Sequence, residues 1–182
     1  MRQFIAALLF VAAAHAAGDA HAEAGEYLSR DAFLEATLET ADPASDVVWL
    51  DEVLQERATE ILGHAPGMLR ARYWYSSGRT AWVFDEIGKE RPITMGVVIE
   101  DGTIRDFRVL TFRESRGWEI RYAFFTRQFD GLGLDGDGEL DATIDNISGA
   151  TLSVRAARRV ANLALVLDDV ARRTNTKIAS TR

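Results

Sequence analysis

The chain has 182 residues, enough for one domain with a hydrophobic core. Hydrophobic residues make up 47% and charged residues 27%, which is the composition of a globular protein rather than a disordered one. The formal net charge of −7 argues against nucleic acid or an anionic membrane surface as a partner, and the lack of Cys excludes disulfides, thiolate metal sites and cysteine nucleophiles.

Residues 1–22 have the features of a secretory signal peptide. Arg2 supplies the positive start, an apolar stretch covers residues 4–14, and cleavage is expected after Ala16 or Ala22. The stretch is shorter than the roughly 20 residues that a membrane-spanning helix needs, and a buried N-terminal helix is the structural alternative. We therefore expect an exported protein of a bacterial periplasm, either soluble or peripherally associated with the inner membrane.

The segment over residues 23–68 is predicted to be mainly helical. Ser29 can cap a helix over residues 30–38, and a second helical period over residues 51–62 ends at a glycine. Between these helices, residues 47–50 form a short apolar run of the kind found in strands.

The main domain is predicted over residues 69–173, followed by a polar, flexible tail over residues 174–182. Alternating apolar and polar residues, with turn signals such as Asp101-Gly102, favour a series of antiparallel strands. The predicted strands cover residues 69–75, 80–84, 93–99, 104–112 and 118–125. A helical pattern over residues 152–170 follows. An antiparallel β-sheet of hairpins packed against flanking helices belongs to the α+β class.

A turn rich in small residues, just before the last predicted helix, has the clearest chemical meaning. Gly149 and Ala150 leave the backbone open to close approach, and the hydroxyls of Ser148, Thr151 and Ser153 gather at the positive end of the helix dipole. Such a helix start suits a phosphate group. On physical grounds alone, the alternative remains open that the turn is only a helix cap.

The same turn resembles the attachment motif of the FMN-binding domain family. The matching residues are Asp145, Ser148, Gly149, Ala150, Thr151 and Ser153. This family includes the covalently flavinylated subunits of the sodium-translocating NADH:quinone oxidoreductase and of the Rnf electron-transport complex. The resemblance implies that a Mg-dependent flavin transferase takes FMN from FAD and joins it through a phosphoester to Thr151, recognising Asp145 and residues 148–151.

The resemblance extends to the strands before the turn. Residues 93–104 and 109–115 are similar to the strand-turn-strand unit of the family, so that the likeness covers roughly residues 80–165. In many members this unit ends in Glu-Thr-Pro-Gly-Leu-Gly, a loop beside the flavin. This chain has Glu114, Ser115, Arg116, Gly117, Trp118 and Glu119 in its place. The implied flavin contacts are therefore residues 114–117 and 148–151, although Arg116 and Trp118 depart from the usual Pro and Leu.

The resemblance implies an electron-transfer carrier with covalent FMN, serving a membrane or periplasmic redox partner, more than a stand-alone enzyme. No glycine fingerprint for a nicotinamide cofactor follows a predicted strand, which disfavours a self-contained NAD(P)H reductase. The alternative from a different class is a binding or assembly module that keeps the fold but is never flavinylated.

No metal site is predicted. Residues 135–146 superficially resemble a calcium loop, but Leu140 stands where Gly is needed and Asn146 stands where a bidentate Glu belongs. We expect an acidic surface turn instead. Two of the three His residues lie in the leader, which leaves only His64 for the body of the chain and does not favour a His-based centre.

Overall fold

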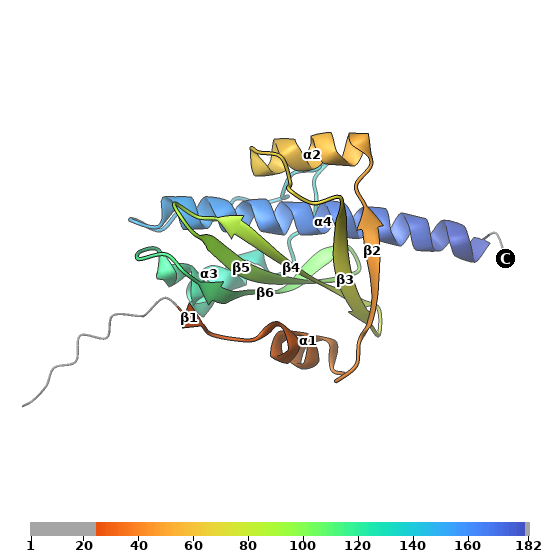
Figure 1. Ribbon diagram of the computed structural model, residues 1–182, viewed down its shortest axis with the longest axis horizontal. Helices are drawn as coiled ribbons and strands as arrows, with labels where there is room; N and C mark the ends of the chain where they lie inside the picture. The colour runs from red at the N-terminus through yellow and green to blue at the C-terminus, as the bar shows by residue number, and fades with distance from the viewer. Residues whose placement is uncertain (1–24, 181–182) are drawn as a thin grey trace, which may run out of the picture.

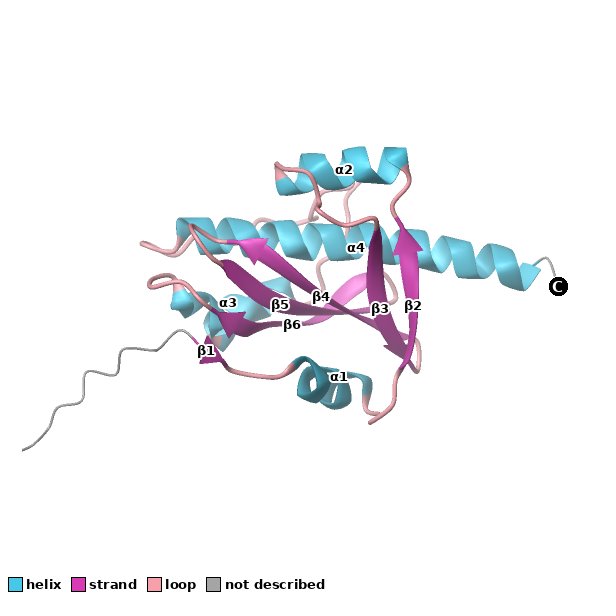
Figure 2. Ribbon diagram, viewed as in Figure 1, coloured by secondary structure: helices cyan, strands magenta, loops and turns pink. Residues whose placement is uncertain are grey.

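Within residues 25–180, which the computed structural model describes, six strands form one antiparallel sheet in the order β1-β6-β5-β4-β3-β2 (Figure 2). The strands are β1 (Gly25–Glu26), β2 (Ala44–Trp49), β3 (Arg70–Ser76), β4 (Arg79–Ile87), β5 (Pro92–Glu100) and β6 (Thr103–Phe112). Consecutive strands from β2 to β6 pair with one another, although α2 lies between β2 and β3 in the chain, while β1 pairs with β6 at the far edge.

Helices cover both faces of this sheet (Figure 1). They are α1 (Arg30–Leu38), α2 (Glu52–Leu62), α3 (Ala123–Thr126) and α4 (Thr151–Ser180), with short 3-10 helices η1 (Trp118–Arg121) and η2 (Arg127–Phe129). The larger hydrophobic core lies between the sheet and α4 with α2, and a smaller core lies under α1 on the opposite face. The predicted α+β fold class is confirmed.

Local sequence signals account for most element boundaries. Ser29 caps α1, its Oγ accepting the Ala32 N–H at 3.2 Å, and Asp51 caps α2, its Oδ1 accepting the Leu54 N–H at 2.9 Å. Between β5 and β6, the two residues of the predicted hairpin turn both have positive φ, +51° at Asp101 and +81° at the following glycine. That pairing is what a type I′ turn requires.

The strand predicted over residues 118–125 is wrong, because this stretch forms η1 and α3. Beside the end of β6, the outer sheet edge is already taken by β1, so the chain finds no free edge there. Gly117 adopts φ +87° and turns the chain away from the sheet. The aromatic residues Phe125 and Phe129 are then buried and pack edge-to-face, with 5.5 Å between ring centroids.

Two segment boundaries differ from the sequence-based division. The segment over residues 23–68 contributes β2, which pairs with β3, so this segment and the domain predicted over residues 69–173 share one sheet. The last helix begins at Thr151 and continues to Ser180, through most of the stretch predicted as a flexible tail.

The predicted export signal over residues 1–22 lies outside the described residues. Among the helices of residues 25–180, none has both the length and the apolar character that crossing a membrane requires.

Candidate functional site

The N-terminus of α4 carries free hydrogen-bond donors. The Ala150 N–H donates to the Ile147 oxygen at 2.9 Å, and the Val154 N–H makes the first helical bond, to the Ala150 oxygen at 2.9 Å. Among the hydrogen bonds of residues 25–180, none uses the backbone N–H groups of residues 151–153. These three N–H groups at the positive end of the helix dipole are therefore available to bind an anion.

Of the three hydroxyls expected near this helix start, that of Thr151 is exposed and lines a pocket. Its Oγ1 accepts a hydrogen bond from Asn146 Nδ2 at 3.0 Å. Ser153 is buried under the helix, and Ser148 is exposed but does not line the pocket. Two of these residues, Thr151 and Ser153, line the pocket, and Thr151 is the exposed one.

The pocket has a volume of about 600 Å³ and joins three stretches of the chain. Its lining residues are Lys89, Glu114, Ser115, Arg116, Gly149, Ala150, Thr151, Leu152 and Ser153. The loop after β6 thus lies opposite the start of α4, as the family resemblance implies for residues 114–116. This volume falls in the range of sites for small organic ligands.

Glu114 holds together two of the segments that line the pocket. Its Oε1 accepts the backbone N–H groups of Lys89, Glu90 and Arg91 at 2.6, 2.6 and 2.9 Å. Burial acts to raise the pKa of Glu114, but these three donors and the Lys89 charge outweigh it, so the pKa lies below its ordinary value. The expected flavin contact at Glu114 is therefore a carboxylate that ties the β4–β5 connection to the end of β6.

Gly117 brings the same loop into close contact with α4. A Cβ placed on this glycine would lie 2.4 Å from Ser153 Oγ and 3.5 Å from Ala150 Cα. With φ at +87°, the position also has a backbone conformation that other residues adopt at a cost. Gly117 is thus required for the fit of the loop against the helix.

Two cations flank the pocket, Lys89 and Arg116. Arg116 was expected beside the flavin, whereas Lys89 was missed by the sequence analysis. Lys89 Nζ lies 3.1 Å from a carboxylate oxygen of Glu90, and both side chains are about 70% exposed, so this surface pair holds Lys89 only weakly. Its position in the connection between two predicted strands gave no signal, because only the fold brings that connection to the start of α4.

Other predicted residues lie outside the pocket. Asp145 is exposed, and its N–H donates to Gln128 Oε1 at 2.7 Å. Arg155, one turn after Thr151, lines a different pocket. Trp118 is half-buried and packs edge-on against Tyr122 at 5.7 Å between ring centroids.

The acidic turn that superficially resembles a calcium loop is closed by its own hydrogen bonds. Asp135 Oδ1 accepts the backbone N–H groups of Asp137 and Glu139 at 2.9 and 3.0 Å. Arg57, which belongs to α2, donates a hydrogen bond from Nη2 to the backbone oxygen of Gly138 at 2.8 Å. Across residues 25–180, no group of three or more acidic or His side chains is arranged to hold a metal ion.

Residues 88–166 match the model of the FMN-binding domain family. The chain carries an FMN-binding domain. No curated protein and no solved structure matched the chain. The FMN-binding domain begins in the β4–β5 connection and ends within α4, so that it contains all nine residues that line the pocket at Thr151.

The pocket residues fit the cofactor that this domain implies. FMN ends in a phosphate, for which the free N–H groups at the start of α4 and the two cations Lys89 and Arg116 supply hydrogen bonds and charge. The open volume beside them has room for an organic group attached to that phosphate.

Proposed function

We propose that FMN is attached to the Oγ1 of Thr151 through its phosphate. The observation that carries this proposal is the convergence, in one pocket, of an exposed Thr151 hydroxyl, the unused N–H groups of residues 151–153 and the cations Lys89 and Arg116. These groups offset the negative charge of a phosphodiester.

A flavin transferase with FAD as its donor would complete the attachment. The Thr151 oxygen forms a new bond to the phosphorus on the FMN side, the anhydride bond between the two phosphorus atoms of FAD breaks, AMP leaves and the hydroxyl proton is released. The side chain of Asn146 donates to Oγ1, which leaves a lone pair and the hydroxyl proton of Thr151 to face the pocket. Asp145 and residues 148–151, which are exposed except for the buried Ala150, form the turn that the transferase would recognise.

In this proposal the protein is an extracytoplasmic electron carrier that serves a membrane or periplasmic redox partner. Bound flavin accepts and donates one or two electrons, and the chain supplies binding, orientation and electrostatics. Export is supported by the sequence of residues 1–22, and a covalent tether keeps a cofactor that a periplasmic protein could not recover once lost.

Intact mass spectrometry tests the attachment. Co-expression with a flavin transferase should add the mass of one FMN minus one water to the wild-type chain, and Thr151→Ala should abolish the addition. Thr143→Ala is the matched control, because its exposed hydroxyl lies just before the recognised turn and outside the pocket. We expect this variant to retain the acceptor hydroxyl and to become flavinylated.

A wild-type chain that stays at its unmodified mass in the presence of active transferase would refute the carrier proposal and favour the non-flavinylated module. Mass added to Thr151→Ala would instead place the attachment on another residue. N-terminal sequencing of protein from a periplasmic fraction tests export, and recovery of the uncleaved chain in the cytoplasm would contradict it.

A further inference from the structure

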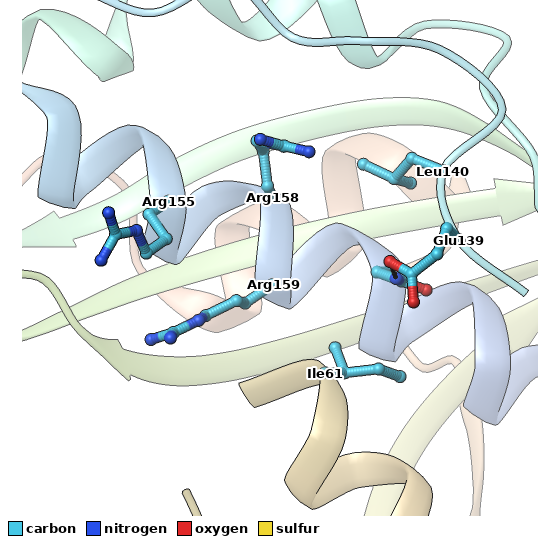
Figure 3. A pocket seen from close by; sticks show the side chains of 7 residues that line it. Ile61, Glu139, Leu140, Arg155, Arg158 and Arg159 are labelled. Atoms are coloured by element: carbon cyan, nitrogen blue, oxygen red, sulfur yellow. Dashed lines mark hydrogen bonds between the residues drawn. The ribbon is translucent and has the colours of Figure 1, made fainter. Parts of the chain in front are cut away.

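A second pocket lies further along α4 than the pocket at Thr151 and shares none of its lining residues (Figure 3). It has a volume of about 240 Å³ and is formed by α2, α4 and the loop before residue 141. Its lining residues are Ile61, Glu139, Leu140, Arg155, Arg158, Arg159 and Asn162. This volume suits a small ion better than a cofactor of the size of FMN.

Three guanidinium groups are concentrated here in an otherwise acidic protein of net charge −7. The spacing of Arg155, Arg158 and Arg159 along α4 places them on neighbouring positions of one helix face. Arg159 Nη1 lies 3.3 Å from Glu86 Oε1. Within residues 25–180, neither Arg155 nor Arg158 has an acidic group at ion-pair distance, so their charges remain available to a ligand.

Asn162 adds a second, independent sign of a ligand. The residue is only 4% exposed; its Nδ2 donates to Glu139 Oε2 at 2.8 Å, while its buried Oδ1 has no hydrogen-bond partner. The reversed amide would place two oxygens against each other, so the bond to Glu139 fixes the orientation. A buried acceptor without a donor is uncommon and costly, and Asn162 lines this pocket, so a ligand that reaches Oδ1 with an O–H or N–H group would supply the missing donor.

Glu139, the one carboxylate in the lining, already has a partner within the protein for each of its oxygens. Glu139 Oε1 lies 3.0 Å from Arg57 Nη2, and its Oε2 accepts from Asn162. Glu139 therefore does not compete for Arg155 and Arg158, and the lining keeps a positive charge.

We propose that this pocket binds a small oxyanion that also carries an O–H group, such as hydrogen phosphate or the phosphate of a small hydroxylated ester. The arginines supply charge-assisted hydrogen bonds to the anionic oxygens, and the O–H donates to Asn162 Oδ1. Sulfate has nearly the same size and charge as hydrogen phosphate but no proton to donate near neutral pH. The site therefore discriminates between the two anions through Asn162.

Isothermal titration of the flavinylated protein with inorganic phosphate, sulfate and glycerol 3-phosphate tests the proposal. We expect one saturable phosphate site and binding of sulfate that is about tenfold weaker or more, the worth of one lost hydrogen bond to a buried acceptor. Glycerol 3-phosphate distinguishes the two sources: tighter binding than phosphate identifies a phosphate ester as the ligand, and weaker binding identifies the free ion.

Arg158→Gln should lower the phosphate affinity about tenfold or more, since it removes one charged donor. Arg72→Gln is the control, an exposed Arg of β3 on the opposite face of the sheet. Asn162→Leu should keep the fold, checked by thermal unfolding, and should reduce the preference for phosphate over sulfate to about one. Repeating the titration in Thr151→Ala separates this site from the flavin, because the arginines are unchanged in that variant.

Absence of saturable phosphate binding in both proteins, or equal phosphate affinity in wild type and Arg158→Gln, would overturn the site. Equal affinity of the wild type for sulfate and phosphate would overturn the assignment of Asn162 as the acceptor. Failure of flavinylation would leave the Thr151→Ala titration interpretable, so the two proposals fail separately.

Discussion

Glu114 lies buried at the end of β6, and its Oε1 accepts three backbone N–H groups from the β4–β5 connection. That connection carries Lys89, the cation that the sequence analysis missed. Glu114, which the family resemblance implies as a flavin contact, therefore also supports the β4–β5 connection, a second segment of the pocket lining. Because this short connection is held at three N–H groups, its cation stays close to the proposed phosphate site.

Replacing this carboxylate tests the role of its charge. We expect Glu114→Gln to lower the free energy of unfolding by about 1–3 kcal/mol, because the three donors lose an ionised acceptor. Urea denaturation near neutral pH measures the loss. Glu90→Gln is the matched control, since the Glu90 side chain is exposed and, among the described residues, forms an ion pair with Lys89 alone. An equal effect of both substitutions would contradict the buried role of Glu114.

The pH dependence of this effect follows from the lowered pKa of Glu114. A carboxylate whose pKa is lower in the folded state than the reference value of 4.5 stabilises the fold above that value, and this stabilisation is lost as the pH falls through the folded-state pKa. The stability difference between wild type and Glu114→Gln should thus shrink in acid. A difference that stays constant from neutral pH to well below 4.5 would rule out the charge as its cause.

At the scale of elements, the loop after β6 and the start of α4 fit together at Gly117. Its φ is +87°, and an added Cβ would meet Ser153 Oγ at 2.4 Å. Gly131 has nearly the same φ, +82°, with no atom within 4 Å of an added Cβ. Gly117 and Gly131 thus have similar backbone conformations, but of these two only Gly117 is packed against a helix.

We expect Gly117→Ala to destabilise the protein by about 1–2 kcal/mol more than Gly131→Ala, because both variants strain the backbone and only the first overpacks a contact. Thermal or urea unfolding of the two variants measures this difference. Adding Ser153→Ala to Gly117→Ala should restore part of it by removing the nearest atom. Equal stability of the two single variants would show that the loop moves away from α4 at no cost.

Elements with a local cause could be predicted from the sequence, and elements with a distant cause could not. Ser29 and Asp51 cap their helices, and Asp101 starts the predicted hairpin turn, because each acts on residues next to it. Residues 118–125 were misassigned because their apolar run suits a strand, while the occupied edge of β6 is set by residues almost a hundred positions earlier.

The residues of the candidate site also divide into those with a local sequence signal and those without one. Its attachment turn was recognisable as a motif, since residues 148–151 are contiguous. Lys89 and the pocket around Arg158 depend on the packing of segments far apart in the chain, which no local pattern records.

At the scale of the whole molecule, a buried charge cluster joins three separate elements. Glu86 of β4 is 3% exposed. Its carboxylate lies 3.1 Å from Nε2 of His64, which belongs to the loop after α2, and 3.3 Å from Nη1 of Arg159, which belongs to α4. His64 Nδ1 faces the Ala65 carbonyl oxygen at 2.9 Å. Both ring nitrogens thus face acceptors, which favours the protonated imidazolium.

The pKa of His64 is raised, first by its hydrogen bond to the Ala65 carbonyl and then by the bond to Glu86, against the opposing effects of burial and Arg159. The stabilisation from this residue is present in full below the reference pKa of 6.5 and is lost as the pH rises through the folded-state value. Since the side chain is 48% exposed, we expect less than about 1 kcal/mol.

The stability of His64→Gln should therefore differ from that of the wild type more at about pH 5.5 than at about pH 8.5. Denaturation in urea at the two pH values measures the change. Glu60→Gln, a surface carboxylate of α2 that pairs with Arg57, should show no such trend. A gap that widens with rising pH would contradict the protonated state of His64.

The position of α4 after all six strands has a consequence for the order of folding. The sheet face that α4 covers is complete once β6 has formed, yet it stays uncovered until the thirty-residue helix has docked. Contacts between α4 and the strands of the middle of the chain are non-local, and such contacts form late in folding. Because Thr151 lies on the first turn of this helix, its pocket exists only in the finished fold, so the proposed attachment of FMN would follow folding and would not guide it.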